Sequence, residues 1–378
     1  MFKRNLIAVS LTLAALASAQ ASAAVVGGGA TLPEGLYQAP GVLSSGFTPY
    51  VGTGSGTGKT AFFSNNGSLF NQPGATVDYA GSDSVVSQAE LNAYNSQSAA
   101  LYGPLVQIPS AATSITVPYN VTGLSELDLT SQQLADIFAG NITDWSQLGG
   151  PNIPITVVYR LDASGTTEIL VNHLNNVDGT AVPVVSNSFA TAIGFDPKNP
   201  PAGSTYVGAT SDSGVVSLVN ATDGAIGYAG PDVVDFDDPA KVARINGELP
   251  SGVNVIAALN SISLPVGGAG NASDPLAWVP ASQLANPSAG YPIVGVTSLL
   301  FSQCYQDADD LASIRDFVTR HYAANPALSN NAAISAHSLI PLPAAWKAQV
   351  RNNFVTNQTG NGLDIGNVNE CNGKGRPL

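Results

Sequence analysis

The sequence predicts an α/β protein of two domains behind an export signal, and three observations lead to that prediction. Strand-like runs alternate with helix-like runs over much of the chain, as they do in folds with parallel sheets. The length of 378 residues exceeds the roughly 100–200 residues of a single domain. Apolar residues make up 44% of the chain and charged residues only 10%, so the chain can bury substantial cores.

The N-terminal segment has the organisation of a secretory signal peptide. Lys3 and Arg4 precede an apolar run over residues 6–16, and a small-residue A-x-A site ends at Ala23. The apolar run is too short to span a bilayer, which takes about 20 residues as a helix. We therefore expect residues 1–23 to be removed and the mature chain, beginning at Ala24, to be exported to the periplasm or the medium. We do not expect it to be embedded in a membrane.

Secondary structure is predicted from periodicity and from the residues that flank each run. Strands are expected at 76–80, 113–119, 155–160, 225–228 and 293–301. Helices are expected at 88–95, 131–138, 167–174, 309–322 and 344–354. In the fourth helix, apolar residues recur on one face, with acidic residues at its start and basic residues at its end, which suits the helix dipole. The alternation favours largely parallel sheets.

Charge and cysteine content restrict the partners and the compartment. The net charge is −13, and it becomes −15 when Lys3 and Arg4 are lost, so nucleic acids and anionic lipid surfaces are repelled. Cys304 and Cys371 are the two cysteines of the chain. In an oxidising compartment they are expected to form one disulfide that ties the tail to the body, with a catalytic thiol as the alternative.

Four short segments are suited to present backbone N–H groups or hydroxyls to an anion. They are residues 27–32 at the mature N-terminus, the glycine-rich run 52–59, residues 79–83 after a predicted strand, and residues 159–166 between a strand and a helix. The second segment resembles a nucleotide P-loop, but Thr53 occupies the position of its first glycine, so we interpret it as a Gly/Ser loop that cradles an anion.

The fourth segment is the most informative. Its predicted strand ends at Arg160, and a helix begins near Ser164, so Ser164, Gly165 and Thr166 would offer unpaired N–H groups at a helix N-terminus. Arg160 adds a guanidinium that can grip two oxygens, and Asp162 is close enough in sequence to brace it. Taken alone, the same pattern also fits a capped helix with a surface salt bridge.

Asp83 is unexpected in such a segment because its carboxylate would repel an anion. It becomes useful if the ligand carries a proton that the carboxylate accepts, as phosphate does at neutral pH and sulfate does not. An ordinary turn aspartate after Gly81-Ser82 is the alternative interpretation.

Enzymatic signatures are weak. His173, His321 and His337 show no metal-ligand spacing, so we expect surface or packing roles for them and neither a metal nor a cofactor. Ser55 and Ser164 lie outside any G-x-S-x-G nucleophile elbow.

The segments 27–33, 54–59, 80–83, 157–167 and 292–305 together resemble the DING family of phosphate-binding proteins, which is similar to the phosphate-binding subunit of a phosphate ABC transporter. PLPAAWKAQV at 341–350 and CNGKGRPL at 371–378 extend the resemblance over the mature chain. The name-giving D-I-N-G start is replaced by Ala24-Val25-Val26-Gly27, and Ala135 and Asp178 stand where the family has a further cysteine pair.

The resemblance implies a type II periplasmic-binding-protein fold with a ligand cleft between two lobes. The first lobe would comprise residues 24–112 and 285–378, and the second residues 113–284. The Gly/Pro/Ser/Asn-rich stretch 264–292, which from composition alone could equally link to a separate domain, would then contain the return crossing. The phosphate-binding residues implied by the resemblance are Thr31, Leu32, Ser55, Asp83, Arg160, Ser164, Gly165 and Thr166.

Three functions are compatible with these sequence features, in order of preference. The first is capture of inorganic phosphate, with rejection of sulfate, by a monomer that delivers it to the permease of an ABC transporter. The second is a secreted phosphomonoesterase or phosphodiesterase that works without a metal at the same site. The third is an extracellular adhesion or surface protein that uses the fold only as a scaffold.

Overall fold

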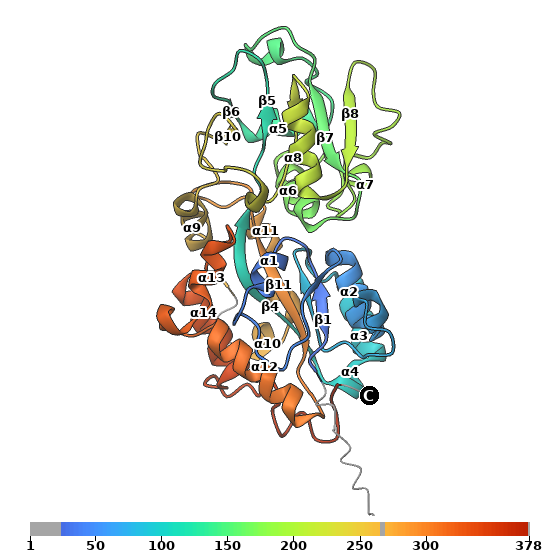
Figure 1. The fold of residues 1–378 in the computed structure, drawn as a ribbon, viewed down its shortest axis with the longest axis vertical. Coiled ribbons are helices and arrows are strands. Elements are labelled where there is room, and N and C mark those ends of the chain that lie inside the picture. Colours follow the sequence, from blue (N-terminus) through green and yellow to red (C-terminus); the bar gives the residue numbers. More distant parts are fainter. Residues whose placement is uncertain (1–23, 265–268, 377–378) are drawn as a thin grey trace, which may run out of the picture.

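The computed structural model describes residues 24–264 and 269–376, so the predicted signal peptide lies outside the described residues. The chain forms two lobes, shown one above the other in Figure 1, and each is built around its own β-sheet. The predicted α/β class with two lobes is therefore confirmed. Within these described ranges, every helix is too short or too polar to span a bilayer.

The first lobe, the lower one in Figure 1, contains a mixed sheet in the order β2-β1-β3-β11-β4. Its strands are β1 (Gly27–Gly29), β2 (Val51–Gly52), β3 (Tyr79–Ser82), β4 (Leu105–Ser114) and β11 (Val294–Ser302). Strand β1 pairs parallel with β2 and β3, whereas β11 runs antiparallel to β3 and β4. The expectation of largely parallel sheets is wrong for this half, because β4 leads the chain out of the lobe and β11 leads it back.

The second lobe contains a sheet in the order β5-β9-β7-β8 and a two-stranded parallel sheet of β6 and β10. The strands are β5 (Tyr119–Asn120), β6 (Asp128–Leu129), β7 (Thr156–Arg160), β8 (Thr205–Ala209), β9 (Ala225–Ile226) and β10 (Arg244–Ile245). Strand β7 is parallel to both β8 and β9, and β5 is antiparallel to β9.

Helices cover both sheets (Figure 1). In the first lobe they are α1 (Glu34–Gln38), α2 (Ser55–Ser64), α3 (Gln88–Gln97), α4 (Ala99–Tyr102), α12 (Ala308–His321), α13 (Asn331–Ala336) and α14 (Ala344–Val350). In the second lobe they are α5 (Ser131–Phe138), α6 (Gly165–Val177), α7 (Phe189–Ile193) and α8 (Ser211–Ala221). Between β10 and β11 lie α9 (Gly252–Asn260), α10 (Ala269–Ala272) and α11 (Ala281–Leu284).

Single turns of tighter or wider helix complete the elements. The 3₁₀ turns are η1 (Gly67–Phe70), η2 (Trp145–Leu148), η3 (Pro231–Val233), η4 (Pro275–Trp278) and η5 (Pro326–Leu328). A π-helical turn, η6 (Arg351–Val355), follows α14 directly, so the helix predicted over 344–354 changes its hydrogen-bonding pattern after Val350.

Helix α5 has the predicted bounds, α3, α6 and α12 lie within a few residues of theirs, and β7 and β11 lie within one residue. The strand predicted at 76–80 begins later, at Tyr79, and the one predicted at 225–228 is two residues long.

The strand predicted over 113–119 is wrong. All ten residues of β4 are buried, and the strand ends at Ser114, after which the chain crosses to the second lobe with only isolated bridges before β5. Pro109 and the polar residues of β4 interrupt the apolar pattern from which a buried strand is predicted. The structure accommodates Pro109, which has no N–H to donate, with a register shift against β11 beside it.

The division into lobes at 24–112, 113–284 and 285–378 stays a prediction. The sheets themselves show that β4 remains in the first lobe to Ser114 and that β11 belongs to it from Val294.

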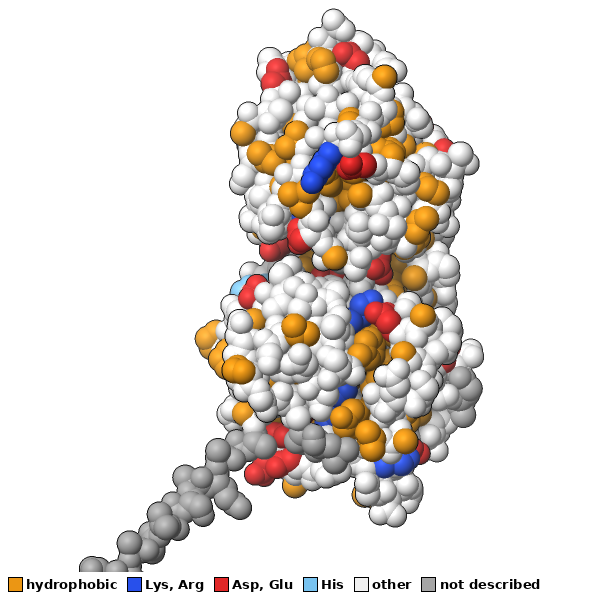
Figure 2. Space-filling view, turned by 90° about the vertical axis from the view of Figure 1, so that its right-hand side faces the viewer, with side chains coloured by type: hydrophobic (Ala, Val, Ile, Leu, Met, Phe, Trp, Pro, Cys, Tyr) orange, Lys and Arg blue, Asp and Glu red, His pale blue; other side chains and the backbone are white. Residues whose placement is uncertain are grey.

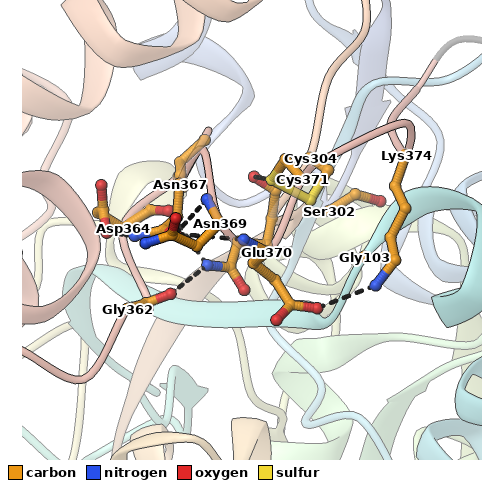
Figure 3. The surroundings of a disulfide bond; sticks show 12 residues. Gly103, Ser302, Cys304, Gly362, Asp364, Asn367, Asn369, Glu370, Cys371 and Lys374 are labelled. Carbon is orange, nitrogen blue, oxygen red and sulfur yellow. Dashed lines mark hydrogen bonds and ion pairs between the residues drawn. A yellow bond between two sulfur atoms is a disulfide. The ribbon is translucent and has the colours of Figure 1, made fainter.

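The C-terminal tail is fastened to the first lobe in two ways. The predicted disulfide between Cys304 and Cys371 is present, with a Cα–Cα distance of 5.2 Å (Figure 3). Beyond it, Arg376 is 0% exposed and its guanidinium lies between the rings of Phe62 and Tyr102, 4.0 and 4.4 Å from their centroids. Its Nη2 donates to Phe62 O at 2.8 Å and its Nε to Ser302 Oγ at 2.7 Å, so the tail is an integral part of the lobe.

We expect replacement of both cysteines by serine to lower the free energy of unfolding. The two cysteines are separated by 67 residues, and closing a loop of that size is worth about 4 kcal/mol in the chain-entropy account. Guanidinium unfolding of the double variant and of the oxidised wild type would measure the difference. A change below about 1 kcal/mol would show that the contacts of Arg376 alone hold the tail.

Candidate anion-binding site

Three predicted site segments follow three neighbouring strands of the first lobe. Strands β2, β1 and β3 are parallel, so their carboxyl ends lie at one edge of the sheet. The loop with Thr31 and Leu32 follows β1, Ser55 follows β2 as the first residue of α2, and Asp83 follows β3 directly. Ser55 Oγ accepts a hydrogen bond from the Asp83 N–H at 3.0 Å and lies 3.5 Å from Asp83 Oδ2.

The glycine-rich run 52–59 is not the loop that the sequence predicted, because α2 begins at Ser55. Its glycines serve close packing: a Cβ on Gly58 would lie 2.6 Å from Gly29 Cα. Gly54, before the helix, has φ 88°, a conformation that favours glycine. The absence of side chains therefore lets α2 lie directly on β1, and this contact outweighs the low helix propensity of glycine.

The fourth predicted segment has the expected geometry in the second lobe. Strand β7 ends at Arg160, and Ser164 is the N-cap of α6, where its Oγ accepts from Thr167 N at 3.4 Å. Ser164, Gly165 and Thr166 are all buried. The positive end of the α6 dipole is therefore aimed at the interior of the molecule.

Arg160 is held by two carboxylates. Its Nε donates to Asp162 Oδ1 at 2.8 Å, its Nη2 pairs with Asp162 Oδ2, and its Nη1 pairs with Asp212 Oδ1. Burial acts to lower the pKa of Arg160, but the hydrogen bonds and charges of Asp162 and Asp212 raise it overall. These bonds use three of the five guanidinium N–H groups, so two remain to meet a ligand in a fixed orientation.

Asp212, in the first turn of α8, is a residue that sequence reasoning missed. Its Oδ2 accepts from Thr166 Oγ1 at 3.1 Å and from Gly230 N at 3.0 Å, so it links β7, α6 and the chain after β9. The signal in the sequence is the position of Asp212, at the start of a helix that follows the short strand β8.

The two halves of the site meet across the lobes. A Cβ on Gly165 would lie 2.3 Å from Asp83 Cβ and 3.0 Å from Ser55 Oγ, so α6 of the second lobe rests directly on the first lobe. Glu168 of α6 accepts a hydrogen bond from Val85 N at 3.1 Å, also across the lobes. We call this contact between the lobes, formed by Ser55, Asp83, Val85, Gly165 and Glu168, the junction. In Figure 2 the molecule narrows between its two lobes, where the junction lies.

The structure thus brings Ser55, Asp83 and Gly165 into contact, and it joins Arg160 to Thr166 through Asp212. Leu32 reaches the second lobe beside Gly230, where a Cβ would lie 3.6 Å from Leu32 Cδ1. Thr31 is exposed at the margin of this group.

Two carboxyl groups at the junction hold protons unusually well. Burial is the main cause that raises the pKa of Asp83 to about 7; the charge of Asp212 acts in the same direction, while Thr297, Ser55 and Arg160 oppose it. Burial likewise raises the pKa of Glu168 to about 6. Asp83 Oδ1 is buried, and it has no hydrogen-bond partner in residues 24–264 and 269–376. That oxygen is therefore available to a proton on a ligand.

The site carries hydroxyls, helix N-termini and an arginine, which suit an oxyanion. In the described part of the chain, no three His, Cys, Asp or Glu side chains cluster as a metal site would require. His173 and His321 are buried and bonded to Ser131 and Ser110, respectively, at 2.9 and 2.8 Å, which fits the predicted packing role.

A family model and a curated relative match this chain over most of its length. The PBP superfamily domain matches residues 16–319. The chain is 50% identical over 385 residues to alkaline phosphatase L of Pseudomonas aeruginosa, with 100% of both chains covered.

Solved structures are similar over nearly the whole chain. PfluDING, a high affinity periplasmic phosphate-binding protein bound with phosphate, is 41% identical with a TM-score of 0.83, over 94% of this chain and 100% of that chain. A phosphate-binding protein from Stenotrophomonas maltophilia is also 41% identical, with a TM-score of 0.81 and the same coverage.

We expect Asp212→Asn to cost about 2 kcal/mol of unfolding free energy, because a buried arginine then keeps one carboxylate partner instead of two. Asp162→Asn is the matched control: the Asp162 side chain is 39% exposed against 13% for Asp212, so its loss should cost at most about 1 kcal/mol. Denaturant unfolding measures both. Equal costs, or a larger one for Asp162→Asn, would contradict the assignment of Asp212 as the main anchor.

Proposed function

The chain belongs to the PBP superfamily and, within it, to the DING family of phosphate-binding proteins, and on that premise we propose that it captures inorganic phosphate with high affinity between its two lobes. The observation that carries the proposal is the junction itself. The N-termini of α2 and α6 meet there beside Asp83, whose Oδ1 has no hydrogen-bond partner among the described residues, and Arg160 is joined to Thr166 of α6 through Asp212.

Each group has a part in holding the ion. The N–H groups at the start of α2 and α6, that of Thr166 among them, and those in the Thr31-Leu32 loop donate to phosphate oxygens, together with the hydroxyls of Ser55 and Ser164. Arg160, oriented by Asp162 and Asp212, directs its two remaining N–H groups at the same oxygens. The eight residues implied by the family resemblance remain our proposed ligand set.

Asp83 supplies selectivity against sulfate. Above the raised pKa of Asp83, about 7, its carboxylate is ionised and accepts the proton that phosphate still retains, whereas sulfate has none to donate. With sulfate, the buried carboxyl oxygen would face a charged oxygen without a hydrogen bond, a cost of about 1–3 kcal/mol or more.

Capture requires the lobes to close. The close approach of Gly165 to Asp83 and Ser55 supports a closed state in which both halves of the site enclose the ion. We further propose that the chain is exported, that it acts as a monomer, and that it delivers phosphate to the permease of an ABC transporter. PfluDING, the similar protein described above, is periplasmic.

Isothermal titration of phosphate-stripped protein tests the function. We expect micromolar or tighter binding of phosphate, about −8 kcal/mol or better, and no response to sulfate. Asp83→Asn should weaken phosphate binding or admit sulfate, reducing the preference for phosphate about tenfold or more. Asp310→Asn is the matched control, because Asp310 is also a buried carboxyl with a pKa raised to about 6 by burial, and it lies in α12, outside the junction.

The absence of any binding heat with phosphate would overturn the proposed function. An unchanged phosphate-to-sulfate ratio in Asp83→Asn would remove only the role assigned to Asp83.

A second candidate function is hydrolysis of phosphoesters, since the relative that is 50% identical is named alkaline phosphatase L. The site contains a serine hydroxyl, Ser55 Oγ, 3.5 Å from Asp83 Oδ2, and the raised pKa of that carboxyl suits a general base. Under the leading proposal this protein does not cleave phosphoesters. Any cleavage of a chromogenic phosphoester by a purified sample then comes from a contaminating enzyme, and it should persist in Ser55→Ala and Arg160→Ala. Loss of cleavage in both variants would favour the enzyme instead.

A further inference from the structure

A cavity of about 160 Å³ lies in the first lobe and shares no residue with the junction. It is bordered by the segment after α12, by η5, by the start of α13 and by α14. In Figure 1, α13 and α14 lie on the opposite flank of the lobe from α2. Its lining is apolar except for three side chains, Asn331, Lys347 and Arg351.

The two basic side chains of this cavity have no acidic partner. Lys347 is 6% exposed, and its Nζ donates to Asn331 Oδ1 at 2.9 Å. Arg351 is partly buried, and its Nη1 donates to Tyr322 O at 3.2 Å. Neither cation takes part in any ion pair within the described residues. In a chain with 26 acidic and 13 basic residues, this arrangement is unusual.

The cost of this arrangement is electrostatic. Lys347 in α14 and Arg351, the first residue of η6, both line the cavity, where their like charges repel. Burial and then the charge of Arg351 lower the pKa of Lys347. Helix α12 faces the pair with Arg320 and His321. Arg320 is paired with Asp316. Burial is the main cause that lowers the pKa of His321 to about 4, so His321 is neutral near pH 7. Among the described residues, no acidic side chain pairs with either cation, and the acceptors that they have are the Asn331 amide oxygen and the Tyr322 carbonyl.

An anion between Lys347 and Arg351 would remove the repulsion between them. The residues that line the cavity indicate the chemical class of that anion. Ala323, Pro326 and Leu342 give the cavity an apolar surface, which a hydrated inorganic ion would not use. Lys347 lies in the PLPAAWKAQV segment, and none of the residues that line its cavity belongs to the proposed phosphate ligands.

We propose that this cavity is a second ligand site, and that it binds a small organic acid. The carboxylate contacts Lys347 and Arg351, and the apolar body packs against Ala323, Pro326 and Leu342. Asn331 holds the Lys347 ammonium in position and offers its amide N–H groups to the same carboxylate.

Fluorine NMR with para-fluorobenzoate tests the site, and para-fluorobenzyl alcohol serves as the neutral probe of the same shape. We expect the acid to bind saturably. We expect the alcohol to bind at least about tenfold more weakly, a difference in binding free energy of about 1.4 kcal/mol or more. Repetition with saturating phosphate should leave the affinity of the acid unchanged, because the junction is a separate site.

Variants locate the binding. Lys347→Met keeps the apolar stem and removes the charge, and it should abolish the preference for the acid over the alcohol. Lys241→Met, at an exposed lysine of the second lobe, is the matched control and should bind as the wild type does. If Lys347→Met lacks the circular dichroism of the folded protein, Arg351→Gln provides the same test at a less buried position.

Three results would overturn the proposal: no saturable binding of the acid by the wild type, equal binding of the acid and the alcohol, or an unchanged preference in both Lys347→Met and Arg351→Gln. Displacement of the acid by phosphate, with no effect of Lys347→Met, would assign the binding to the junction instead.

Discussion

The N-terminus of α6 rests on Asp83 and Ser55 of the opposite lobe, and most of the functional geometry depends on that contact. Helix N-termini carry unpaired N–H groups and positive potential, and burying them is costly unless an acceptor is present. Here the N-termini of α2 and α6 come together from different lobes, since a Cβ on Gly165 would lie 3.0 Å from Ser55 Oγ. Only a glycine at position 165 permits so close an approach. The junction thus concentrates hydrogen-bond donors in a protein whose net charge is −13.

Carboxylates around the junction explain how an acidic protein can hold an anion. Asp162 and Asp212 orient Arg160, and Asp212 also accepts from Thr166 and Gly230, so each of these carboxylates is directed at a donor. Asp83 and Glu168 instead have raised pKa values, because burial disfavours their charged forms. The charges of Asp162 and Asp212 are therefore balanced by the donors that they hold, whereas Asp83, under the proposal above, accepts the proton of the ligand.

Helix α2 is secured at both ends. Its first residue, Ser55, belongs to the junction, while its last carbonyls face the tail, where Arg376 Nη2 donates to Phe62 O at 2.8 Å and Nη1 to Asn65 Oδ1 at 3.0 Å. A cation at the C-terminal end of a helix is favoured by the dipole. The disulfide keeps the tail in place, so residues near the end of the chain support a helix that begins at the ligand site.

The sequence alone determined the α/β class, the amphipathic helices, the disulfide and the helix that begins near Ser164. Periodicity, capping residues and the cysteine content are local or compositional signals, so they can be recognised without the tertiary structure. Comparison with a known family, rather than residue pattern, supplied Thr31, Leu32 and Ser55 as site residues. Only the tertiary structure decided that 55–64 is a helix, that β4 is a buried strand despite Pro109, and that Asp212 anchors Arg160. Each of these features depends on contacts between segments that are distant in the sequence, such as Gly58 against Gly29. The energies of such contacts outweigh local propensity, and local sequence patterns do not reveal them.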